Sequence, residues 1–99
     1  VNKVAETKNL TVNIDVKGIT GGYSTSEEED ISKTVNIKVN DETRTGVDKN
    51  NSNYSVSLSG KDGESVTVKV VITDPSTGQE IYSSSRTVVF GSQDTISFK

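Results

Sequence analysis

The sequence predicts an all-β fold, a β-sandwich of about seven strands. The first observation is the choice of apolar residues, with 14 Val and 7 Ile against 2 Leu, 1 Ala and no Met. β-branched side chains pack well on a pleated sheet, whereas Leu, Ala and Met are the apolar helix formers. The second observation is a repeated alternation of apolar and polar residues, interrupted by segments rich in Gly, Asn and Asp. A length of 99 residues fits one domain with one core.

The N-terminal part contains the first predicted strand and a long loop. Residues 1–8 show no pattern, and we expect a linker or lead-in strand there, before a sandwich domain at residues 9–99. Apolar and polar side chains alternate over residues 10–17, which predicts a half-buried strand. Residues 18–30 break the alternation with adjacent glycines and a polar, acidic run, so we expect a loop and no helix.

The middle of the chain predicts three further strands. Residues 31–39 place their apolar side chains on one face, and residues 42–47 form a weaker, mostly polar segment typical of a sheet edge. After an Asn-rich turn, Tyr54, Val56 and Leu58 alternate with serines. Asp62-Gly63 then predicts a tight hairpin turn into the next strand.

The C-terminal part predicts the remaining strands. Valines and Ile72 share one face of residues 65–73, and Asp74–Gly78 has the residue types of a type I turn followed by a left-handed glycine. The apolar phase slips within residues 79–90, which indicates a bulge in Ser83–Arg86. Gly91-Ser92 is expected to turn the chain into a last strand, with Ile96 and Phe98 inward.

Two segments resemble a known type of domain. Residues 47–58 place an Asp, a small polar turn and an aromatic residue before the alternating letters S-V-S-L, and residues 62–70 follow an Asp-Gly turn with alternating valines. Both are similar to segments of bacterial Ig-like, fibronectin-III-like surface-protein modules. The resemblance covers residues 45–90 and implies an Ig-like or FnIII-like antiparallel β-sandwich in a secreted or cell-surface protein. It transfers no functional residue.

Composition argues against several classes of function. The chain has no His and no Cys, so it lacks the usual general base near neutral pH, the best nucleophile and any thiolate ligand for a metal. We therefore expect no enzymatic activity. A net charge of −3 argues against nucleic acid as a partner, and no apolar stretch is long enough to insert in a membrane.

An acidic run is the first candidate site. Glu27, Glu28, Glu29 and Asp30 offer hard oxygen ligands that suit Ca²⁺, so calcium is the one metal or cofactor we consider. The alternative is a solvated loop kept open by its own charge. Asp41, Asp48 and Asp62 join a site only if their loops converge.

Two aromatic residues and one lysine are further candidates. Tyr23 in the Gly-rich loop and Tyr82 near the phase slip are expected to bind a glycan if they are exposed, whereas Tyr54 begins an apolar face and fits the core. Lys33 lies on the apolar parity of its strand, where some surface sandwiches hold an intramolecular crosslink. The alternative for Lys33 is an edge lysine that discourages strand pairing.

These observations favour a non-catalytic structural, spacer or adhesion module whose partners are neighbouring domains or copies of the same protein. One alternative is a filament subunit, in which residues 1–8 or 94–99 add a strand to the open sheet edge of the next copy. The other alternative is a carbohydrate-binding accessory module with surface glycans as partners.

Overall fold

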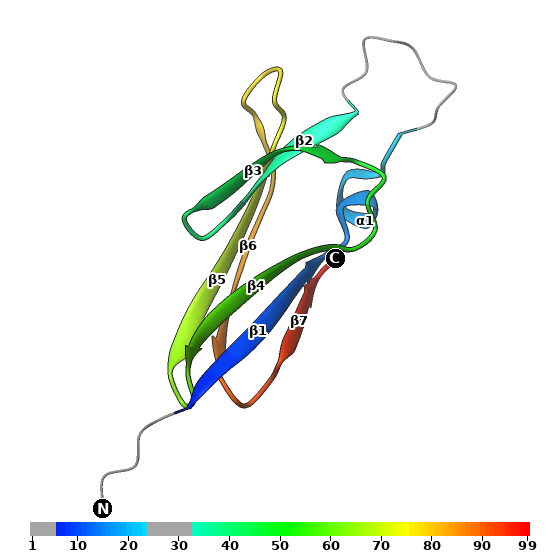
Figure 1. Cartoon of the computed structure of the whole chain (residues 1–99). Helices are drawn as coiled ribbons and strands as arrows, with labels where there is room; N and C mark the ends of the chain where they lie inside the picture. The colour runs from blue at the N-terminus through cyan, green and yellow to red at the C-terminus, as the bar shows by residue number, and fades with distance from the viewer. Residues whose placement is uncertain (1–5, 24–32) are drawn as a thin grey trace, which may run out of the picture.

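A computed structural model describes residues 6–23 and 33–99, whose strands form two sheets that face each other (Figure 1). The three-stranded sheet has the order β4-β1-β7, from β4 (Tyr54–Lys61), β1 (Thr7–Ile14) and β7 (Thr95–Phe98). The four-stranded sheet has the order β3-β2-β5-β6, from β3 (Glu42–Asp48), β2 (Thr34–Val39), β5 (Ser65–Thr73) and β6 (Glu80–Val89). The predicted all-β, sandwich-like architecture is confirmed, and β1 begins two residues before the expected domain boundary at residue 9.

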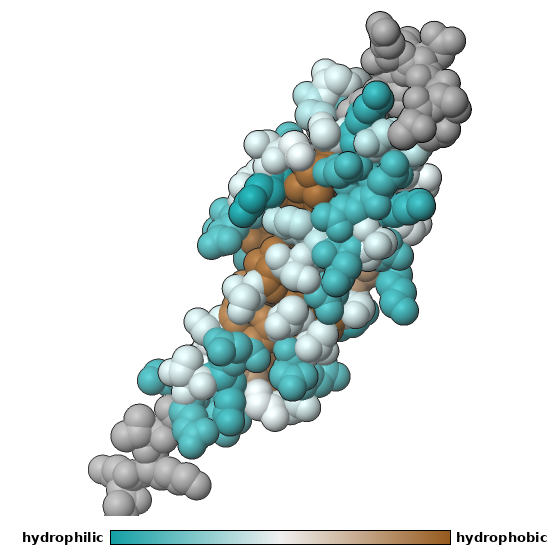
Figure 2. All heavy atoms as spheres, turned by 45° about the vertical axis from the view of Figure 1, so that its right-hand side comes forward, coloured by the Kyte–Doolittle hydropathy of each residue, from teal (hydrophilic) through white to brown (hydrophobic). Residues whose placement is uncertain are grey.

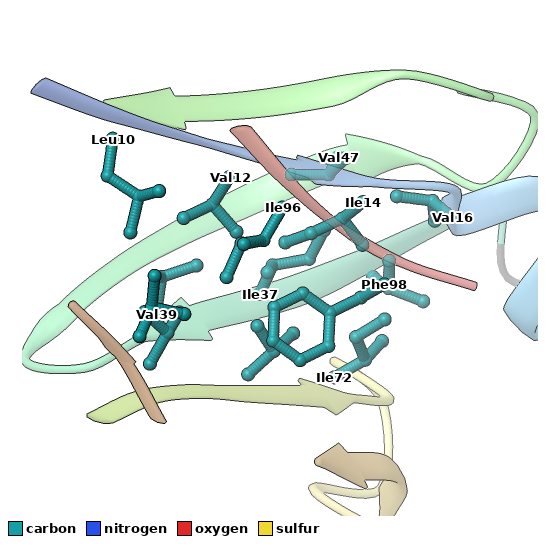
Figure 3. Packing of buried hydrophobic residues seen from close by; sticks show 14 of the residues in the cluster. Leu10, Val12, Ile14, Val16, Ile37, Val39, Val47, Ile72, Ile96 and Phe98 are labelled. Atoms are coloured by element: carbon teal, nitrogen blue, oxygen red, sulfur yellow. The ribbon is translucent and has the colours of Figure 1, made fainter. Parts of the chain in front are cut away.

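The core lies between the two sheets and follows the predicted alternation. In β1, Leu10, Val12 and Ile14 are fully buried, while the intervening polar residues face outward. Figure 3 shows side chains of both sheets meeting in this space, with Ile72 and Phe98 among them. Each such side chain contributes about 1.5–3 kcal/mol when it leaves water. On the face shown in Figure 2, hydrophilic side chains surround the apolar residues that reach the surface.

The expectation of a strand as far as residue 17 and no helix after it is wrong. The chain forms the short helix α1 (Val16–Thr20) directly after β1. The side chain of Asp15 caps it by accepting a hydrogen bond from the amide of Gly18 at 2.9 Å. Gly21 ends it in a left-handed conformation with φ 86°. Five residues are too few to show a helical period, so only the caps signal this helix.

The predicted hairpin at Asp62-Gly63 is a turn of another kind. The amide of Glu64 donates to the carbonyl of Lys61 at 2.9 Å, which closes the turn as expected. However, β4 pairs with β1, and β5 pairs with β2 and β6. The turn therefore carries the chain from one sheet to the other instead of joining two paired strands.

The turn between β5 and β6 is wider than a type I turn. The amide of Gly78 donates to the carbonyl of Asp74 at 2.7 Å, one residue beyond the reach of a β-turn hydrogen bond. Gly78 has a positive φ of 75°, as the sequence predicts. The carboxylate of Asp74 holds the loop by accepting from the amide and hydroxyl of Ser76 at 2.8 and 2.7 Å.

The paired strands of the described residues contain two bulges, and the predicted bulge lies at a different place. The pairing of β5 with β6 steps from Ile72 opposite Tyr82 to Thr73 opposite Glu80, so Ile81 is the extra residue, not one within Ser83–Arg86. The change of apolar phase in residues 79–90 therefore does correspond to a bulge, but the bulge is at Ile81, the first apolar residue of that segment. A second bulge lies in β3. There the pairing steps from Val47, opposite Val35 of β2, to Arg44, opposite Ile37 of β2.

The sandwich is not wholly antiparallel, because β7 runs parallel to β1. Thr95–Phe98 pairs with residues 11–14 of β1, and it contributes Ile96 and Phe98 to the core as predicted. Gly91-Ser92 lies in a turn closed by the amide of Ser92 on the carbonyl of Val89 at 3.1 Å. This turn also crosses between the sheets, which brings the last strand beside the first.

Candidate functional site

Tyr23, a predicted glycan ligand, is fastened to the loop between β3 and β4. Its amide donates to Oδ1 of Asn50 at 2.9 Å, and its carbonyl accepts from Nδ2 of the same residue at 3.0 Å. One side-chain amide thus satisfies both backbone groups of Tyr23, as a neighbouring strand would. The amide of Lys17 also donates to the carbonyl of Asn51 at 3.0 Å, so α1 is tied to the same loop. Sequence reasoning treated Asn50 only as a turn residue.

The ring of Tyr23 is partly buried and has charged neighbours. Its hydroxyl donates to Oδ2 of Asp48 at 3.5 Å, and Nζ of Lys33 lies 5.8 Å from the ring centroid. Partial desolvation raises the pKa of the Tyr23 phenol, and the negative charge of Asp48 raises it further. Lys33 is exposed, and no charged or polar residue among those described is buried, so the buried environment of a lysine crosslink is not present there. We define Tyr23, Lys33, Asp48 and Asn50 as the loop-end cluster.

Tyr82 and Tyr54 both contact the core. Tyr82 lies opposite Ile72 in the ladder of β5 and β6, and its partly buried side chain packs against the buried cluster. Tyr54 packs against the same cluster from β4, as predicted. Since Tyr23 is held by the loop-end cluster and Tyr82 packs on the core, the two residues do not form a common stacking platform.

The predicted calcium ligands Glu27, Glu28, Glu29 and Asp30 lie outside the described residues. Within residues 6–23 and 33–99, no three His, Cys, Asp or Glu side chains come together as a metal site would require. Asp41, Asp48 and Asp62 therefore do not converge.

A groove opens along one side of the sandwich, between β3 of one sheet and β4 of the other. Its volume is about 490 Å³. Its lining combines apolar, hydroxyl and charged side chains, namely Val39, Glu42, Thr43, Arg44, Tyr54, Ser55, Val56 and Ser57. Both strands that border the groove are at the edges of their sheets.

The two ends of the described fold lie at opposite ends of one strand. β1 begins at Thr7, and its last residue, Ile14, pairs with Phe98 of β7. Eight strand residues span about 25 Å. Figure 1 shows the start of β1 at the bottom of the ribbon and the C-terminus at the other end of β1, beside α1, while the turn between β5 and β6 extends beyond that point. A chain that enters at Thr7 and leaves at Lys99 therefore runs the length of β1.

No family model, curated protein or solved structure matches this chain. No helix in the described part of the chain has the length and apolar character needed to cross a membrane.

Proposed function

We propose that this chain is a non-catalytic Ig-like module that spaces or presents its neighbours in a secreted or cell-surface protein. The observation that carries the proposal is the position of Thr7 and Phe98 at opposite ends of β1. A domain with this geometry separates whatever is attached before and after it by a fixed distance. The absence of His and Cys from the sequence supports a role without chemistry.

The strand order supports the Ig-like part of the proposal. In immunoglobulin sandwiches, the C, F and G strands share one sheet, a C′ strand can extend it, and B lies in the other sheet. β3, β2, β5 and β6 follow the order C′-C-F-G, and β1 pairs with β4 as B does with E. The departure is β7, a C-terminal strand that occupies the free side of β1.

The structure gives less support to a filament in which the C-terminal residues add a strand to the next copy. Residues 95–98 already pair with β1 of their own chain, and donating them to another copy withdraws Ile96 and Phe98 from the core. Nothing in the described residues favours the glycan-binding alternative, since its two tyrosines are engaged within the fold.

Distance measurements between the two ends test the spacer. Because the chain has no Cys, Glu6→Cys and Lys99→Cys give two unique positions for a donor and an acceptor dye. We expect one transfer efficiency that stays constant until the domain unfolds, as a fixed separation requires. A broad, denaturant-sensitive distribution, like that of a Gly/Ser linker, would contradict the proposal. So would calorimetric titration that shows a defined small ligand bound at millimolar affinity or tighter.

A further inference from the structure

Among the edge strands of the described fold, β4 has the least protection against pairing. Sheets discourage unwanted pairing by short, bulged or charged edge strands. β3 has a bulge and carries Glu42 and Arg44, β6 has a bulge at Ile81, and β7 is four residues long. By contrast, β4 pairs with β1 in unbroken register, and its residues 54–60 contain neither a charge nor a proline. The sequence therefore leaves this edge open to another strand.

The inner face of β4 is also incompletely covered. Leu10, Val12 and Ile14 of β1 have no solvent exposure. Their direct partners on β4 share the same face but are only partly buried, namely Leu58, Val56 and Tyr54. Tyr54 and Val56 also line the groove between β3 and β4, which leaves part of each side chain uncovered. A further strand along β4 would cover these side chains.

The free backbone groups of β4 belong to its serines. On the side of β1 that faces β7, the amide of Thr11 donates to the carbonyl of Asp94 at 2.8 Å, and the amide of Asp15 donates to the carbonyl of Phe98 at 2.9 Å. Backbone groups alternate in direction along a strand, so the even-numbered residues of β1 face β4. The register pairs them with the even-numbered residues of β4. The N–H and C=O groups that point away from β1 are therefore those of Ser55, Ser57 and Ser59.

We propose that a second copy of this chain binds here, with the two β4 strands antiparallel about a two-fold axis perpendicular to the sheet. Such an axis keeps the inner face of both strands on the same side. With Ser57 opposite its counterpart, Ser55 pairs with Ser59, and Val56 lies beside Leu58. The two small sheets then form one continuous sheet, β7-β1-β4-β4-β1-β7.

Self-pairing is favoured over a foreign strand by pattern and by charge. The incoming strand must alternate apolar inner residues with small outer ones and carry no charge, and residues 54–60 of β4 meet this specification, with Lys61 following at the end of the strand. Glu42 and Arg44 line the groove, and neither forms an ion pair within the described residues. A two-fold axis repeats Glu42 and Arg44 on the partner's side, so that a residue of each sign is present on both sides of the groove. The inference does not depend on the spacer function, because a monomeric spacer remains possible without it.

The oligomeric state of the full chain tests the inference. Sedimentation velocity from micromolar to millimolar concentration should show a monomer–dimer equilibrium. Ser57→Lys places like charges opposite each other across the axis and should weaken the dimer about tenfold. Ser57→Pro removes the free N–H itself and should abolish the dimer. Ser83→Lys, at an exposed serine of the edge strand β6, is the matched control and should leave the equilibrium unchanged.

Three results would overturn the inference. The first is a wild-type chain that stays monomeric at millimolar concentration. The second is a dimer weakened equally by Ser57→Lys and Ser83→Lys, which would indicate a general effect of charge. The third is a monomer that binds only an unrelated strand-forming peptide at β4, which would assign the edge to a foreign partner. Circular dichroism of each variant confirms that it is folded, and amide exchange at Ser55, Ser57 and Ser59 locates the interface.

Discussion

Arg86 covers the core at one side of the sandwich although its own side chain is exposed. It occupies an inner position of β6, opposite Val68 of β5, where an apolar residue would continue the pattern. Its guanidinium lies 5.1 Å from the centroid of the Phe98 ring. A guanidinium over an aromatic face is attracted to the ring, and the aliphatic stem shields apolar surface from water.

Replacing Arg86 should therefore destabilise the fold. We expect Arg86→Ala to lower the free energy of unfolding by about 1 kcal/mol, because it removes both the ring contact and the covering stem. Arg86→Lys should retain part of this stability. Urea denaturation measures the difference, with Arg44→Ala on β3 as a control that has no cation–π contact among the described residues. Equal stabilities of Arg86→Ala and wild type would contradict the role of the contact.

Asn50 gives a second prediction at the residue scale. Asn50→Ala leaves the amide and carbonyl of Tyr23 without their partner and should cost about 1–2 kcal/mol. Asn50→Asp keeps the acceptor but loses the donor, and it adds a negative charge near Asp48. Faster hydrogen exchange of the Tyr23 amide should accompany the Ala variant. Asn53→Ala, at an exposed position in the same loop, should change neither quantity.

At the scale of elements, alternation predicted which way side chains point but not which strands pair. The inward residues of β1, β2, β5 and β7 were predicted because a period of two is local information. The sheet to which a strand belongs depends on contacts between segments that are distant in the sequence. A turn such as Asp62-Gly63 is therefore compatible both with a hairpin and with a crossing between sheets. For the same reason the parallel pairing of β7 with β1 could not be foreseen.

The candidate site was harder to predict than the fold. The sequence singled out Tyr23 but not Asn50, because a two-point contact across 27 residues leaves no local pattern. The sequence placed Tyr82 near the change of apolar phase. Because the bulge is at Ile81, the side chain of Tyr82 lies on the inner face of β6. The groove beside β4 results from the positions of two edge strands, which again requires the pairing to be known.

The turn between β5 and β6 has a predicted pH dependence. Hydrogen bonds from the hydroxyl and then the amide of Ser76 lower the pKa of Asp74. A carboxyl group whose pKa is lower in the folded than in the unfolded state stabilises the fold fully at pH values above its unfolded pKa, which is about 3.9. This contribution is lost as the pH falls through the lower, folded pKa. Ser76→Ala should therefore raise the pKa of Asp74 and reduce the acid dependence of stability. Carbon-detected NMR titration of Asp74 measures the shift, and an unchanged pKa would contradict it.

At the scale of the whole molecule, β1 and β7 form the mechanical link between the two ends. They are adjacent and parallel, and the amides of Thr11 and Asp15 donate across the pair to the carbonyls of Asp94 and Phe98. A force applied at Thr7 and Lys99 pulls the two strands in opposite directions along their length. Their hydrogen bonds are then loaded together, in shear, and must break together.

Single-molecule pulling in two directions tests this arrangement. Attachment at residues 7 and 99 should give a high unfolding force, because the β1–β7 bonds share the load. Attachment at residues 7 and 61, which are neighbours at one end of the β1–β4 ladder, should give a lower force, since these bonds are peeled one pair at a time. Weakening the packing of β7 on the core by Ile96→Ala and Phe98→Ala should lower the first force more than the second. Equal forces in the two directions would show that β7 carries no load and would remove the mechanical basis for an in-line spacer.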